Sequence, residues 1–138
     1  MQQPNNLNLF KTLFLVYGIF LFFFSLFALL YAAMGGVFFA IPEFNEMDGE
    51  LPFNPGIIFI VFGFIGFAIM VTLGIVAIKA SKHLGNTTNY NFVLVASILI
   101  CFTGLMGMLL GIFSIIEINK PEVKQLFPSK GIEGSQNK

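Results

Sequence analysis

The sequence predicts an all-α integral membrane protein, and its lysine distribution favours a bundle of four transmembrane helices. Hydrophobic residues make up 57% of the 138-residue chain and charged residues only 10%, whereas soluble domains average about 25% charged residues. A soluble domain of this length leaves roughly 30% of its chain surface in water, so it could not hide so many apolar side chains. Three long uncharged blocks supply the candidate spans, because a helix needs about 20 apolar residues to cross a bilayer.

The first uncharged block runs from Thr12 to Ile41. We expect a transmembrane helix over residues 12–36, with the N-terminus of the chain in the cytoplasm. A secretory signal has an apolar region of about 7–15 residues, so this longer block is expected to remain in the membrane. Gly35 and Gly36 are predicted to end or bend the helix, because glycine loses the most conformational freedom in a helix.

Residues 42–55 are interpreted as a non-cytoplasmic loop, since they contain three prolines, four acidic residues and no lysine. A cation-binding loop is the alternative, but the acidic residues lack the spacing of a calcium-binding loop. The second block then predicts a transmembrane helix over residues 56–78. Lys79 and Lys82 follow it and are expected in the cytoplasm.

The third block, Phe92 to Ile116, has two interpretations. A helical hairpin over residues 87–118, turning near Thr103 to Gly107, would place all seven lysines on one side of the membrane, as the positive-inside rule favours. Length favours one long, tilted third helix and three crossings, because two helices need about 17 residues each even at the short limit. Small residues at steps of three or four also suit one continuous helix.

Glycines at helical spacing predict close helix packing, since small residues let membrane helices approach each other. The packing can lie within one chain or between two copies. The candidate residues are Gly63, Gly66, Gly74, Gly104, Gly107 and Gly111.

The segment 119–127 predicts a short amphipathic helix at the membrane surface, with Asn119 as its cap and Pro121 in its first turn. Its lysines would attract anionic lipids by about 1 kcal/mol each. An interfacial anchor is the first interpretation and docking of a partner protein is the alternative. Residues 128–138 are expected to be disordered. The candidate docking residues are Lys120, Pro121, Glu122, Val123, Lys124 and Phe127.

The end of the third block and the tail read G-I-F-S-I-I-E-I-N-K-P-E-V-K-Q-L-F over residues 111–127. This stretch resembles a pattern, G-I-W-A-L-x-x-L-N-R-P-E-V-K-x-x-F, that ends a widespread set of small uncharacterised bacterial membrane proteins. The resemblance covers roughly residues 56–127. Ile100 and Gly107 stand where those proteins carry turn prolines, and Glu117 replaces an apolar residue. The resemblance implies a polytopic membrane protein and brings no established activity.

No catalytic, cofactor-binding or metal-binding residues are predicted. The mid-block positions carry no ionisable residue, and the chain lacks a phosphate-binding loop, a zinc-protease motif and a paired-cysteine motif. Seven basic residues without a cluster argue against nucleic-acid binding. We therefore expect a non-catalytic, multi-pass inner-membrane protein that is not an enzyme. It would act as an accessory or scaffold component, packing with a larger membrane-protein partner or with itself in the lipid bilayer. The alternative is a small transporter or holin-like pore.

Overall fold

The computed structural model describes residues 6–42 and 54–127, and these residues form five helices without a strand. The prediction of an all-α chain is therefore confirmed for the described residues. The chain divides into two units: unit 1 contains Met1–Gly18 and Ile75–Lys138, and unit 2 contains Ile19–Gly74. The helices are α1 (Leu7–Ala40), α2 (Pro55–Gly85), α3 (Tyr90–Cys101), α4 (Leu105–Ile118) and α5 (Pro121–Lys124).

Among the described helices, α1 and α2 are long and apolar enough to cross a membrane. They have 34 and 31 residues, longer than the predicted ranges 12–36 and 56–78. Lysine is a good helix former, so Lys11 and Lys79 are accommodated within the helices. At its start α2 has Pro55, whose fixed φ suits a first helical position, and the Asn54 side chain accepts a hydrogen bond from the Gly56 amide at 2.7 Å.

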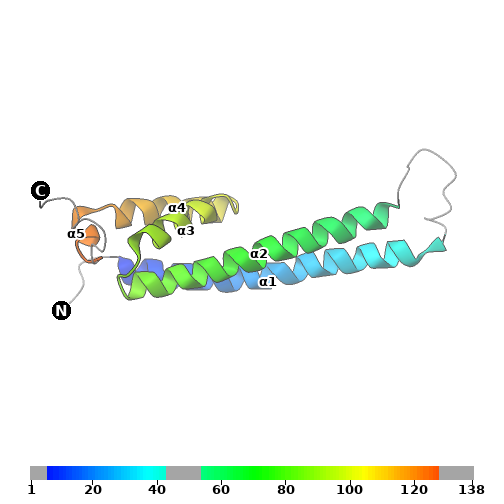
Figure 1. Cartoon of the computed structure of the whole chain (residues 1–138), viewed down its shortest axis with the longest axis horizontal. Helices are drawn as coiled ribbons and strands as arrows, with labels where there is room; N and C mark the ends of the chain where they lie inside the picture. Colours follow the sequence, from blue (N-terminus) through cyan, green and yellow to red (C-terminus); the bar gives the residue numbers. More distant parts are fainter. Residues whose placement is uncertain (1–5, 43–53, 128–138) are drawn as a thin grey trace, which may run out of the picture. The chain divides into compact units, whose positions relative to one another are not determined.

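The third block is a helical hairpin and not one continuous helix (Figure 1). Helices α3 and α4 contact each other, and the chain reverses between them at residues 102–104. Gly104 has a φ of 112°, a conformation that residues with a side chain rarely adopt. The amide of Thr103 donates a hydrogen bond to the carbonyl of Ile100, which closes the end of α3.

The four predicted crossings are not shown by the described residues, because both hairpin helices are shorter than an ordinary span. They have 12 and 14 residues, which gives lengths of about 18 and 21 Å. A span needs about 17 residues to cover the ~30 Å hydrocarbon core. The described residues therefore hold two candidate spans and a short apolar hairpin.

The connection from α2 to α3 contains two non-glycine residues in the left-handed region. Thr87 has a φ of 49° and Asn89 a φ of 52°. Asparagine tolerates this conformation, but a β-branched residue such as threonine is strained in it. Asn89 caps the start of α3 without a side-chain hydrogen bond.

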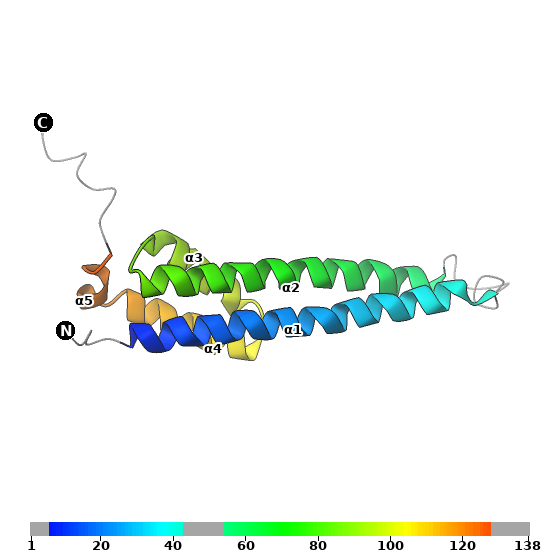
Figure 2. The ribbon, with the colours of Figure 1, turned by 90° about the horizontal axis from the view of Figure 1, so that it is seen from below.

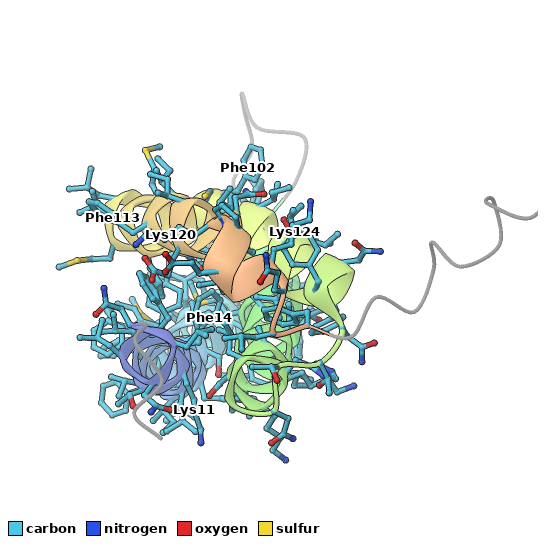
Figure 3. The ribbon with its side chains drawn as sticks, turned by 90° about the vertical axis from the view of Figure 1, so that its left-hand side faces the viewer. Lys11, Phe14, Phe102, Phe113, Lys120 and Lys124 are labelled. Atoms are coloured by element: carbon cyan, nitrogen blue, oxygen red, sulfur yellow. The ribbon has the colours of Figure 1, made fainter. Side chains whose placement is uncertain are left out.

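Unit 1 has a core of apolar side chains contributed by all five helices. Phe14 of α1 is fully buried within it, and Figure 3 shows its side chain between the helices. Phe102 and Phe113 of the hairpin lie on the outside instead. The core residues are Leu7, Phe10, Phe14, Ala77, Ala80, Leu84, Val93, Ala96, Ile100, Ile118, Val123 and Phe127.

In unit 2, α1 and α2 run antiparallel, side by side (Figure 2). Small residues form their contact: a Cβ added to Gly35 would come within 2.8 Å of the Gly56 carbonyl oxygen. Of the two predicted outcomes at Gly35 and Gly36, a helix end or a bend, the helix end is wrong, and the close approach accounts for the glycine at position 35. Gly35 permits the helices to pack, and α1 continues to Ala40.

The tail differs from the predicted amphipathic helix over 119–127, because α5 has only four residues. Lys120 is its N-cap, whereas Asn119 is the C-cap of α4. Val123 and Phe127 point into the core of unit 1 and are 1% and 5% exposed. They are therefore not available to lipid. The predicted tail 128–138 and nearly all of the predicted acidic loop, 43–53, lie outside the described residues.

Candidate functional site

The two glycines of α4 pack against their own unit. A side chain at Gly107 would collide with the Thr103 hydroxyl, the Ile100 carbonyl and the Tyr17 hydroxyl. A side chain at Gly111 would collide with the Cys101 sulfur and the Ser97 carbonyl. These contacts hold α4 against α3 within one copy, so the two glycines are not available for a second copy.

The other predicted packing glycines have different surroundings. A Cβ at Gly63 would come within 2.8 Å of the backbone of Ala32, and one at Gly66 would lie in ordinary contact with Ala28. Gly74 is buried in α2. Gly104 is exposed with open space around it, so it makes no packing contact within the described residues and its positive φ serves the turn.

Polar side chains point into unit 1 and find partners there. The Ser97 hydroxyl donates to the carbonyl of Val93 at 2.8 Å, and its oxygen lies 3.1 Å from the Ser114 hydroxyl oxygen, within hydrogen-bond distance. Both serines are 0% exposed. The Tyr17 and Thr103 hydroxyls lie 2.6 Å apart. Buried polar groups need such bonds because an unpaired one is costly, so these residues join α1, α3 and α4.

The outward side chains of unit 1 are largely apolar. Phe102 is 85% exposed, Leu105 77% and Met106 74% at the tip of the hairpin. The α3–α4 hairpin thus has hydrogen-bonded serines between its helices and large apolar side chains on its outside. This distribution suits a hydrocarbon environment, where backbone and side-chain polar groups must be satisfied internally. Further exposed apolar residues of the hairpin are Val95, Ile98, Leu99, Met108, Leu109, Ile112, Phe113 and Ile116.

A polar cluster joins the end of α4, α5 and the start of α3. Lys120 and Glu117 form an ion pair with an N–O distance of 2.6 Å. Tyr90 donates a hydrogen bond to the Asn119 side-chain oxygen at 2.7 Å. The Lys124 ammonium lies 5.7 Å from the centre of the Tyr90 ring, a cation–π distance. These contacts connect the tail to the hairpin.

The predicted docking residues of the tail therefore divide between two roles. Val123 and Phe127 belong to the core, and Lys120 is paired with Glu117. The remaining three are exposed. Pro121 and Lys124 line a shallow depression together with Gln125 and Phe127, and Glu122 has no ion pair among the described residues.

Sequence reasoning missed a stripe of small residues on the outside of α1 in unit 2. Ala33, Gly36 and Ala40 are all exposed, and the space beside Gly36 is open. Their spacing of three and four residues puts them on one helix face. The spacing was visible in the sequence, but nothing there separates an outward stripe from an inward one. We call these three residues the outward stripe.

The described residues hold no group of three metal-ligating side chains. His83 lies in the last turn of α2, with its Nδ1 atom 2.9 Å from the Thr88 hydroxyl. No family model, curated protein or solved structure matches the chain. The likeness of residues 111–127 to the small bacterial membrane proteins therefore remains a prediction.

Proposed function

We propose that this chain is an integral protein of the bacterial inner membrane that crosses the bilayer through α1 and α2. The support for this is the many large apolar side chains that the hairpin of unit 1 exposes, together with the length and apolar composition of the two helices. The N-terminus lies in the cytoplasm, because every lysine of the described residues is in unit 1 and lysines concentrate on the cytoplasmic side.

In this proposal the α3–α4 hairpin enters the bilayer from the cytoplasmic side and returns to it. With lengths of about 18 and 21 Å, its helices would reach past the middle of the ~30 Å hydrocarbon core without crossing it. The tip of such a hairpin must be apolar on its surface. Phe102 and Leu105, the residues on either side of the turn, are among the most exposed apolar residues of the described chain.

Accessibility of single cysteines tests this topology. The chain has one cysteine, Cys101, so a Cys101→Ser background accepts new probes. Phe102→Cys would report on the tip and Asn91→Cys on the first turn of α3. We expect an impermeant maleimide to label Asn91→Cys from the cytoplasmic side and Phe102→Cys from neither side. Labelling of Phe102→Cys from the opposite side would support two full crossings and contradict the proposal.

The role that we propose is a non-catalytic packing component for a larger membrane protein. The observation that supports this role is the outward stripe. Its small residues would allow close contact with another helix, and no described residue of this chain fills the space beside Gly36. Small residues allow a partner helix to approach closely, where dispersion contacts replace the hydrophobic effect that is absent in lipid.

Purification of the tagged chain from native membranes in mild detergent tests the role. Gly36→Leu fills the outward stripe without touching the chain itself, since the space there is open. Ala68→Leu, at an exposed small residue of α2, is the matched control. We expect a stoichiometric membrane-protein partner with the wild-type chain and the control, and its loss with Gly36→Leu. A discrete homo-oligomer that conducts ions in liposomes would instead support the pore.

A further inference from the structure

We propose that the lysine-bearing end of unit 1 binds anionic phospholipid headgroups, so that the protein prefers them to zwitterionic headgroups. This inference rests on the proposed insertion in the membrane and names the lipid class at its cytoplasmic surface. We call this surface the lysine end. Its residues, all exposed, come from α1, α2 and the segment after α4, and they are Lys11, Lys79, Lys82, Lys120 and Lys124.

Folding brings the lysine end together from segments that are far apart in the sequence. Ser81, which is 1% exposed, donates a hydrogen bond to the carbonyl of Lys11 at 2.7 Å and fixes the first turns of α1 to the end of α2. A Cβ at Gly85 would come within 2.9 Å of the Lys11 side-chain carbons. The missing side chain at Gly85 thus lets Lys11 lie across the end of α2, whose last turn also contains Lys82.

The tail completes the surface on the other side of unit 1. Figure 3 looks onto this end, with Lys120 and Lys124 on one side of Phe14 and Lys11 on the other. Phe127 holds the tail in place, because it is buried and packs edge-on against Tyr90 with ring centres 5.7 Å apart. Lys124 stands over the same Tyr90 ring.

The charge balance of this end is positive. The described residues of unit 1 contain five lysines and two glutamates, Glu117 and Glu122, which leaves three positive charges in excess. Glu117 neutralises Lys120 through the ion pair, and the carbonyls at the end of α2 offset part of one further charge. Lys79, Lys82 and Lys124 have no ion-pair partner among the described residues.

The neighbouring surface identifies the occupant as lipid. Exposed apolar residues begin within one or two turns of the lysines: Leu13 and Val16 on α1 are 42% and 55% exposed. Exposed lysines followed along α1 by exposed apolar residues match the headgroup and acyl regions of one leaflet. Each lysine near an anionic membrane surface contributes a factor of about five in binding, from ~1 kcal/mol per charge.

Lipid selectivity of the full-length protein tests the inference. The protein is reconstituted in phosphatidylcholine bilayers with trace spin-labelled phosphatidylglycerol or phosphatidylcholine, and electron paramagnetic resonance measures the motionally restricted fraction of each label. We expect at least about twofold stronger association of phosphatidylglycerol, weakening as salt is added. The Lys79→Gln, Lys82→Gln, Lys124→Gln variant should lose the preference, and the matched arginine variant should keep it.

Two results would overturn the inference, and a third would overturn its basis as well. Equal association of both labels, or a preference that the glutamine variant retains, would show that the lysine end does not select anionic headgroups. In both cases a restricted fraction for each label would still indicate an integral protein. Absence of a restricted fraction for both labels would contradict the membrane insertion itself.

Discussion

Replacement of Phe14 by alanine tests whether unit 1 is packed as described and whether its surroundings are lipid. Phe14 is fully buried in the core of unit 1. In a water-soluble core this change costs about 3–5 kcal/mol, which includes transfer of the ring from water. In a membrane the separated helices keep the ring in hydrocarbon, so the transfer contribution is small. The cavity contribution remains, at about 24 cal/mol per Å³ over roughly 100 Å³, or about 2 kcal/mol.

The assay is unfolding of the reconstituted protein by titration with sodium dodecyl sulfate, followed by near-ultraviolet circular dichroism of its aromatic side chains. Phe113→Ala is the control, because Phe113 is 57% exposed on the outside of α4. We expect a loss of about 2 kcal/mol for Phe14→Ala and less than about 0.5 kcal/mol for Phe113→Ala. Equal losses would refute the described core. A loss above about 3 kcal/mol would refute the lipid reference state.

Three further predictions concern the hairpin and its ends. Thr87→Gly should raise the free energy of unfolding by up to about 1 kcal/mol, because relief of the left-handed strain at Thr87 exceeds the entropic cost of glycine. Thr88→Gly is the control: it removes the contact with His83, so it should lower the free energy of unfolding in the same titration. Lys120→Gln should lower the free energy of unfolding more than Glu117→Gln, because it leaves the Glu117 carboxylate, whose side chain is 9% exposed, without its cation. A larger loss for Glu117→Gln would contradict the ion pair. Gly107→Leu should disrupt the α3–α4 contact and lower the free energy of unfolding by about 1–3 kcal/mol in the same titration.

The positions of the lysines were the best predictor of how the third block folds. They favoured a hairpin against the argument from length, and the chain does turn at Gly104. The length argument assumed that each arm must cross the bilayer. That assumption left out a hairpin of two short helices. Tyr90–Cys101 and Leu105–Ile118 are both shorter than a transmembrane span.

The remaining errors share one physical cause, which is that a residue's face depends on its neighbours in space. Gly35 has the composition of a helix end, but the opposing Gly56 makes it a packing residue. Val123 and Phe127 form an apolar face that would suit a membrane surface, but both side chains are buried in the core of unit 1. For Gly107 and Gly111 the sequence allowed packing within one chain or between two copies, and their own hairpin occupies that face. A single sequence does not distinguish these alternatives.

The division of unit 1 between the two ends of the chain has a consequence for biosynthesis. Its first helical turns, up to Gly18, leave the ribosome long before Ile118 at the end of the hairpin. At 5–20 residues per second, the roughly 100 intervening residues take about 5–20 s to make. During that interval α1 and α2 can already pair, and the Ser81–Lys11 hydrogen bond can form, whereas the core of unit 1 still lacks the side chains of α3, α4 and the tail. The core around Phe14 is therefore complete only after the hairpin and the tail, with Val123 and Phe127, have been made.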